Sequence, residues 1–216
     1  MIPLAEGVMI EGVKNIVFDY SGVIRDDFDY NYEVAMRMFE KMGGARIPRE
    51  EYKNEMRLPY MDFYNKYFPG AKQKEIDFLF FQGMDEVGHP KPRLYRGVRR
   101  TLELLAAQSI NMTILSSCFH YELLREVEAL GLKKYFPRIF GSVHDKVAIM
   151  PYVMKSMGFS PAETLMVGDM AHDIDAGRAV GAKTVALTQG YYTRERLEKE
   201  TSPDYFIDTL PEILLL

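Results

Sequence analysis

The sequence predicts an α/β protein in which a mainly parallel sheet, flanked by helices, is interrupted by an all-helical insert. Short apolar runs that end on small or acidic residues recur at residues 15–18, 111–115, 164–167 and 183–187. Helical patterns separate these runs, as expected for βαβ units. Residues 28–92 break the alternation and contain no convincing strand.

The first apolar run ends on Asp19 and is followed by Ser21. A buried parallel strand would deliver Asp19 to the C-terminal edge of the sheet, where α/β folds place ligands. A carboxylate two residues after Asp19 could act as a general acid, but this chain has a serine there. The motif therefore indicates a nucleophile without an obvious proton donor.

The pattern of the insert predicts a series of helices rich in aromatic and methionine residues, with proline and glycine between them. The pattern predicts helices at residues 32–42, 48–56, 60–67 and 73–84. Most of the aromatic residues are expected to form a packed core, and some are expected to line a pocket. We therefore predict two units, which are an α/β core at 1–27 and 93–216 and a helical cap at 28–92.

The rest of the chain continues the α/β rhythm. Apolar periodicity predicts helices at residues 97–108 and 121–130. Weaker strands are expected at 138–141 and 204–207. Gly131 and Gly158 stand where glycines commonly end helices.

Further polar residues follow the later strands. Ser116 and Ser117 follow the second run, and their hydroxyl and N–H groups could hold a phosphoryl oxygen. Lys146 precedes a predicted helix and could supply positive charge. Asp169 and Asp173 follow the third run in a Gly-Asp-x-x-x-Asp pattern, and carboxylates of this kind suit Mg²⁺.

Composition narrows the classes of function. The 216 residues are 47% apolar with a net charge of −4, so no basic field favours nucleic acid or an anionic membrane. The single cysteine, Cys118, excludes an internal disulfide. Residues 1–14 lack the features of a signal peptide, and no apolar run is long enough to span a bilayer. We expect a cytoplasmic protein, either a monomer or a homodimer, with a small-molecule substrate.

The order of these elements resembles the haloacid dehalogenase superfamily of phosphohydrolases over almost the whole chain. The shared order is acid, helical insert, strand with serine, lysine, and Gly-Asp-x-x-x-Asp. A cap after the first motif is the arrangement of the phosphoglycolate phosphatase-like, β-phosphoglucomutase-like and phosphonatase-like subgroup. The resemblance implies a Rossmann-like parallel-sheet core and hydrolysis of a small phosphorylated metabolite.

The resemblance also implies a role for each motif residue. Asp19 would be the nucleophile that forms an aspartyl-phosphate, and Lys146 would balance charge. Substrate phosphate would be held by Ser116, Ser117 and Ser21. Mg²⁺ would be bound by Asp19, Asp169, Asp173 and the backbone carbonyl of Ser21. Cap residues would close over the site and select the substrate.

Ser21 departs from the family pattern, because phosphatases of this family usually have a second aspartate there. General acid–base catalysis is typically worth about 10²–10⁴-fold. One interpretation is a phosphatase whose proton comes from substrate, water or the cap. Another is a preference for leaving groups that need little protonation, such as acyl phosphates or phosphoanhydrides.

Other interpretations of the function stay open at this point. A phosphonatase-like enzyme would need a cap lysine, and the candidates are Lys41, Lys53, Lys66, Lys72 and Lys74. Dehalogenase-like members lack the acidic motif that Asp169 and Asp173 form here, which argues against dehalogenation. The remaining alternative is a binding or regulatory module with a degenerate site.

Overall fold

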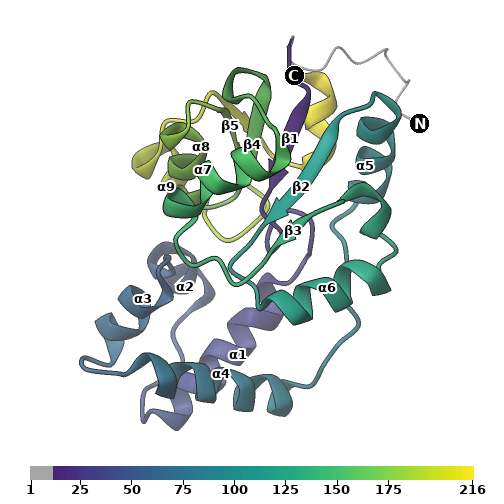
Figure 1. Cartoon of the computed structure of the whole chain (residues 1–216). Coiled ribbons are helices and arrows are strands. Elements are labelled where there is room, and N and C mark those ends of the chain that lie inside the picture. Colours follow the sequence, from purple (N-terminus) through teal and green to yellow (C-terminus); the bar gives the residue numbers. More distant parts are fainter. Residues whose placement is uncertain (1–11) are drawn as a thin grey trace.

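The computed structural model describes residues 12–216, so residues 1–11 of the predicted core unit lie outside the described residues. Its centre is a six-stranded sheet with the order β3-β2-β1-β4-β5-β6, in which all neighbouring strands are parallel (Figure 1). The strands are β1 (Asn15–Phe18), β2 (Asn111–Leu115), β3 (Ile139–Phe140), β4 (Thr164–Gly168), β5 (Lys183–Leu187) and β6 (Tyr205–Ile207). The predicted α/β class and the two weaker strands are thereby confirmed.

Helices cover both faces of the sheet. They are α5 (Val98–Ala107), α6 (His120–Ala129), α7 (Lys146–Met157), α8 (Ala171–Ala179) and α9 (Arg194–Glu200), with short 3₁₀ helices η1 (Lys133–Tyr135), η2 (Pro161–Glu163) and η3 (Leu210–Leu215). Side chains alternate along β1, as a strand requires. Ile16 and Phe18 pack in one apolar cluster with α5 and α6, whereas Val17 packs in another with α7 and α8. The sheet is therefore buried on both faces.

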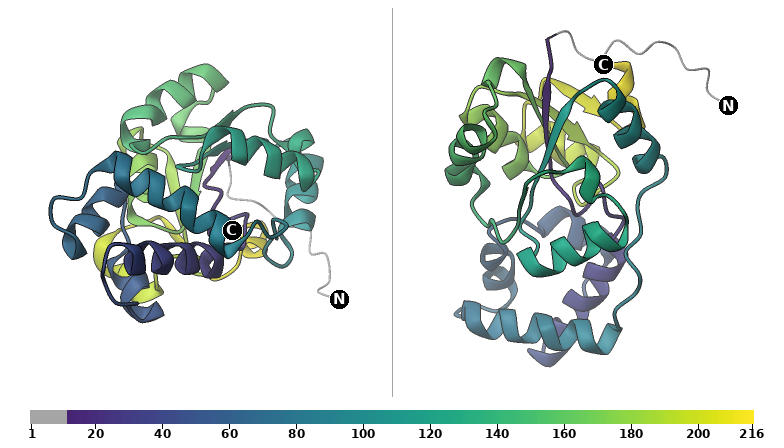
Figure 2. Two further views of the ribbon diagram at one scale, coloured as in Figure 1. Left: turned by 90° about the horizontal axis from the view of Figure 1, so that it is seen from below. Right: turned by 45° about the vertical axis from the view of Figure 1, so that its right-hand side comes forward.

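The insert after β1 is helical throughout its ordered elements, as predicted. Its helices are α1 (Phe28–Lys41), α2 (Arg49–Glu55), α3 (Tyr60–Tyr67) and α4 (Gln73–Val87). They gather at the end of the molecule toward which β2 points, as Figure 1 and the right-hand view of Figure 2 show. We refer to residues 28–92 as the cap. Its apolar cluster includes Met170, Ile174 and Tyr191 of the sheet unit, so the two parts share buried surface.

Two cap helices are longer than the sequence pattern predicted. Helix α1 begins at Phe28 rather than at residue 32, because the Asn31 amide donates to the Asp27 carbonyl and Phe28 is itself buried against Tyr32. Helix α4 extends to Val87 rather than to residue 84. Within residues 12–216, none of the helices is long and apolar enough to cross a membrane.

Candidate active site

The two central strands bring two acids together at the C-terminal edge of the sheet. Strands β1 and β4 are neighbours, and Phe18 pairs in register with Val167. The chain continues as Asp19 after β1 and as Asp169 after β4, and the Asp19 amide donates to the Val167 carbonyl at 2.9 Å. Both side chains are buried. The parallel pairing therefore places these carboxylates side by side, as the sequence pattern predicts.

Lys146 and Asp173 complete a buried cluster with these two acids. Carboxylate oxygens of Asp19, Asp169 and Asp173 all lie within 4.8 Å of one another. Lys146, the first residue of α7, has its Nζ 2.6 Å from Asp173 Oδ1 and 2.8 Å from Asp19 Oδ1. We call these four residues the acid cluster. Asp173 is held further by the Met170 amide, which donates to its Oδ2 at 3.2 Å.

Burial dominates the electrostatics of the acid cluster. Desolvation raises the pKa of Asp19, although the nearby Lys146 ammonium opposes the rise. The pKa of Asp169 is raised well above its ordinary value by burial and by the neighbouring carboxylates. Burial alone would lower the pKa of Lys146, but Asp173 and Asp19 raise it overall, so the ammonium stays charged. His172, beside the cluster, is neutral because burial and Lys146 lower its pKa to about 3.

The residues of the acid cluster fit a divalent cation. Three carboxylates surround one ammonium, which leaves two negative charges in a buried space when all are ionised. Asp169 Oδ1 is buried and accepts no hydrogen bond from any described residue, whereas its Oδ2 accepts from the Tyr191 amide at 2.6 Å. Buried carboxylate oxygens are normally paired or bound to metal. Oxygen donors of this kind suit Mg²⁺.

Gly22 lets the loop after β1 approach Asp169 closely. Its φ is +80°, and a Cβ placed there would lie 2.2 Å from Asp169 Oδ2. Only glycine meets both conditions, since other residues rarely adopt this φ and none could fit the space. The loop backbone, including that of Ser21, therefore lies against the acid cluster.

The serines after β2 occupy two different environments. Ser116 is fully buried, and its Oγ accepts a hydrogen bond from the Cys118 amide at 3.2 Å, which leaves its hydroxyl proton free to donate. Ser117 and Cys118 line the cavity described below. Burial raises the pKa of Cys118 to about 12, so this thiol is not a nucleophile at neutral pH.

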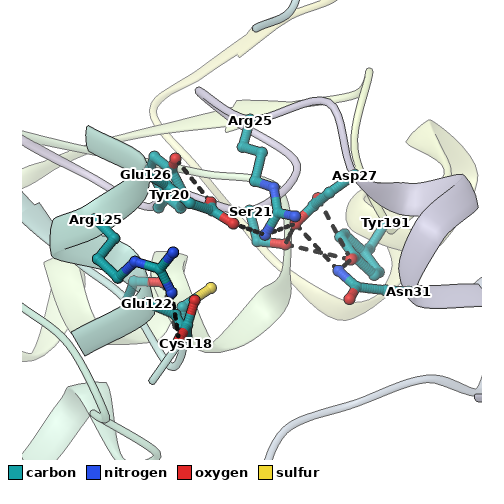
Figure 3. Close-up of polar contacts among 11 residues, drawn as sticks. Tyr20, Ser21, Arg25, Asp27, Asn31, Cys118, Glu122, Arg125, Glu126 and Tyr191 are labelled. Carbon is teal, nitrogen blue, oxygen red and sulfur yellow. Dashed lines mark hydrogen bonds and ion pairs between the residues drawn. The ribbon is translucent and has the colours of Figure 1, made fainter. Parts of the chain in front are cut away.

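Ser21 belongs to a polar network at the junction of sheet and cap (Figure 3). Its hydroxyl donates to Asp27 Oδ2 at 2.6 Å and lies 3.2 Å from the Tyr191 hydroxyl. Asn31, one turn into α1, donates to Asp27 at 3.1 Å and also to Tyr191. Burial raises the pKa of Asp27 to about 6, although Arg25 and the Ser21 hydroxyl partly offset the rise.

Arg25 is bound on both sides by acids in the same region. Its NH1 lies 3.1 Å from Glu126 Oε1 and 3.5 Å from Asp27 Oδ2. Glu126 also accepts a hydrogen bond from the Tyr20 hydroxyl at 3.0 Å. The charge of Arg25 is therefore largely neutralised within the protein.

A cavity of about 190 Å³ lies between the acid cluster and the cap. Asp19, Ser21 and Ser117 line it from the sheet side, and residues of α1, α3 and α4 line it from the cap side. Aromatic and methionine side chains make up about half of its lining residues. The arrangement can therefore hold a small substrate with one end against Asp19.

Sequence reasoning found the acid cluster but missed the network around Ser21. No sequence motif assigned a role to Asp27, Asn31 or Glu126. The spacing of Asp27 and Asn31, which is one helical turn, was the available signal. Tyr191 could not be found in this way, because its position depends on how the loop after β5 folds back.

Comparisons with known proteins give a consistent result. Residues 16–187 match the haloacid dehalogenase-like hydrolase family. A phosphoglycolate phosphatase from Photobacterium profundum is 26% identical over 227 aligned positions, which cover 94% of this chain and 95% of that protein. The pyrophosphatase PpaX from Halalkalibacterium halodurans is 22% identical, with 94% and 95% covered. A haloacid dehalogenase-like family hydrolase from Streptococcus pneumoniae superposes with a TM-score of 0.81 at 18% identity, covering 95% of this chain and 98% of that one.

The family match spans five of the six strands and the whole cap, and the motif order agrees with it. The chain therefore belongs to the haloacid dehalogenase-like hydrolases.

Proposed function

We propose that the protein is a Mg²⁺-dependent phosphohydrolase that acts on a small phosphorylated substrate through an aspartyl-phosphate on Asp19. The observation that carries this proposal is the acid cluster, which lies at the sheet edge beside a cavity. The names of the relatives from Photobacterium and Halalkalibacterium, a phosphoglycolate phosphatase and a pyrophosphatase, support phosphoryl chemistry.

Each residue of the site has a separate role in the proposed reaction. Asp19 forms the bond to phosphorus, and Lys146, 2.8 Å away, keeps its carboxylate charged and oriented. The free proton of the Ser116 hydroxyl and the polar groups of Ser117 hold phosphoryl oxygens. Mg²⁺ bound by Asp19, Asp169 and the Ser21 carbonyl, with Asp173 behind them, would supply positive charge for those oxygens.

The division of the chain into a core at 1–27 and 93–216 and a cap at 28–92 is part of the proposal. Residues of the cap line the cavity on the side away from the acid cluster. A cap in this position can exclude water from the reacting groups and select the leaving group.

The phosphonatase-like alternative lacks support from the cap lysines. Lys41 pairs with Glu86, Lys66 pairs with Glu55, and Lys53 donates to the Gly190 carbonyl. None of the described residues that line the cavity is a lysine. A Schiff base with a bound substrate would need one there.

The test compares wild type with Asp19→Asn and with Asp175→Asn, the same change at an exposed position of α8. Phosphate release from p-nitrophenyl phosphate and acetyl phosphate is measured with Mg²⁺ and with EDTA. We expect Asp19→Asn and EDTA each to lower kcat/KM by more than about 10³-fold, and Asp175→Asn to retain wild-type activity. Undiminished activity in Asp19→Asn would contradict the covalent mechanism. Mg²⁺ binding without turnover of any phosphate would favour a binding module.

A further inference from the structure

The cavity is lined by aromatic rings from both parts of the molecule. Tyr60, Tyr64 and Phe80 contribute from the cap, and Phe119 and Tyr191 contribute from the sheet unit. We call these five residues the aromatic wall. Its two sides meet directly, since the Phe80 and Phe119 ring centroids are 6.2 Å apart. Flat apolar side chains of this kind favour an aromatic ligand.

The volume of the cavity matches a single ring. An engineered apolar cavity of about 150 Å³ is large enough to bind benzene. The cavity here, at about 190 Å³, has room for one ring, with the phosphoryl group at the Asp19 end.

The charges around the cavity oppose an anionic leaving group. Its lining includes Asp77, Glu122 and Glu126 in addition to Asp19. Among the described lining residues, Arg25 is the one permanent cation, and it lies between Glu126 and Asp27. A carboxylate or a second phosphate on the leaving group would therefore face acids without a free partner.

Ser21 places a separate constraint on the leaving group. Its hydroxyl proton is donated to Asp27 at 2.6 Å, so that proton is engaged within the protein. A serine hydroxyl is also a far weaker acid than the carboxyl it replaces. The structure thus provides no carboxylic acid at the position from which the family's phosphatases protonate an alkoxide, and the neighbouring Asp27 carboxyl reaches that position only through the Ser21 hydroxyl.

We infer that the substrate is a phosphate monoester of a phenol, with a ring whose substituents are neutral or cationic. This inference rests on the proposed function and names its substrate class. A phenol has a pKa of about 10, as the tyrosine side chain shows. An aliphatic alcohol is about as weak an acid as water, whose pKa is about 15.7. A phenolate therefore leaves without the proton that Ser21 cannot give.

The proposed reaction balances without a protein acid. The Asp19 carboxylate forms an O–P bond as the bond from phosphorus to the phenolic oxygen breaks, and that oxygen leaves with the electron pair. Water then attacks phosphorus and breaks the bond to Asp19, which regenerates the carboxylate. One hydrogen of that water stays on the released phosphate, and the other reaches the phenolate through solvent.

The test uses a matched set of phosphates with the full chain and Mg²⁺. Phenyl phosphate and benzyl phosphate share a ring but differ in the leaving oxygen. 4-Aminomethylphenyl and 4-carboxyphenyl phosphate differ in charge, and phosphoglycolate and pyrophosphate represent small anionic substrates. We expect kcat/KM for phenyl phosphate to exceed that for benzyl phosphate by at least about 10²-fold, the lower limit of what general acid catalysis contributes. We expect the carboxyl substituent to lower kcat/KM and the aminomethyl substituent to maintain or raise it.

Two variants separate the leaving-group effect from the charge effect. In a series of substituted phenyl phosphates, log kcat/KM should fall steeply as the pKa of the phenol rises, and Ser21→Asp should flatten that slope. Glu122→Lys should raise relative activity on 4-carboxyphenyl phosphate by several-fold. Glu103→Lys, the same change on α5 outside the cavity lining, should not alter the ratio.

The outcomes distinguish the inference from the function on which it rests. Faster hydrolysis of phosphoglycolate or pyrophosphate than of phenyl phosphate, with Asp19→Asn inactive, would overturn the inference and leave the phosphohydrolase proposal standing. Equal rates for phenyl and benzyl phosphate would also overturn it. Absence of phosphate release from every compound would overturn both. Calorimetry can also measure how tightly the Asp19→Asn variant binds each compound. We expect it to bind phenyl phosphate more tightly than phosphoglycolate, and the reverse order would count against the inference.

Discussion

The two sides of the cavity are built from opposite kinds of side chain. The acid cluster consists of four buried charges fixed by two strand ends and two helix starts. The aromatic wall consists of large rings that come mostly from the cap and carry no charge. Buried charges depend on their partners, whereas apolar side chains tolerate exchange for others of similar volume. The comparison shows that the buried charges come from the sheet unit, whereas most of the aromatic wall comes from the cap.

Loss of Lys146 should have the largest effect on the acid cluster. Lys146→Met leaves Asp19 and Asp173 buried without their ammonium partner. Breaking a buried pair of this kind costs about 3–5 kcal/mol. We expect the free energy of unfolding in urea, measured without metal, to fall by that amount, and activity to fall by more than about 10³-fold. Lys155→Met, on the exposed side of the same helix, is the control. An equal loss of stability and activity in this variant would contradict the special dependence of the acid cluster on Lys146.

Asp27 provides a test at the junction between the two sides. Burial raises its pKa to about 6 from 3.8. Its stabilising contribution is therefore fully present below the unfolded pKa and is lost as pH rises through about 6, a loss of about 3 kcal/mol. The amide in Asp27→Asn does not titrate, so the free energy of unfolding of the metal-free variant should decline less between about pH 4 and pH 7.

The control for this pH dependence is Asp29→Asn, an exposed change two residues away. Its pH dependence should follow that of wild type. Parallel curves for wild type and Asp27→Asn would show that the Asp27 carboxyl is not shifted.

Mg²⁺ should raise the thermal stability of the protein through its contacts with the acid cluster. A ligand at about 100 times its dissociation constant stabilises the folded state by about 2.7 kcal/mol. We therefore expect saturating Mg²⁺ to raise the thermal unfolding midpoint of wild type and to have little effect on Asp169→Asn. Asp175→Asn should respond as wild type does. A full response in Asp169→Asn would remove Asp169 from the metal site.

Arg196 tests how firmly the cap is attached. Its NH1 donates to the carbonyls of Lys53 and Met56, each at 2.7 Å, and its guanidinium lies 3.4 Å from the Tyr192 ring centroid. Arg196→Lys loses the paired hydrogen bonds to these two carbonyls, which should lower the free energy of unfolding by about 1–2 kcal/mol. We expect a rise in KM with little change in kcat, whereas the exposed Arg194→Lys on α9 should change neither. A fall in kcat alone would contradict a role in positioning the cap.

The same contrast explains how much could be predicted from the sequence. The acid cluster was predictable because strand register converts sequence order into position, so acids after β1 and β4 must meet. The cap helices were predictable as elements, but not the direction in which Tyr60 or Phe80 points. The Ser21 network depends on the turn at Gly22 and on the fold of the loop around Tyr191. Both are set by tertiary packing, which no local pattern encodes.

The most direct test of the account is capture of a phosphoryl group on Asp19. Wild type is mixed with phenyl phosphate and Mg²⁺, quenched in acid within one turnover and digested for mass spectrometry. The peptide that contains Asp19 should gain the mass of one phosphoryl group transiently, and the corresponding peptide of Asp19→Asn should not. Release of phosphate within that turnover, with the Asp19 peptide unmodified at every quench time, would contradict the account.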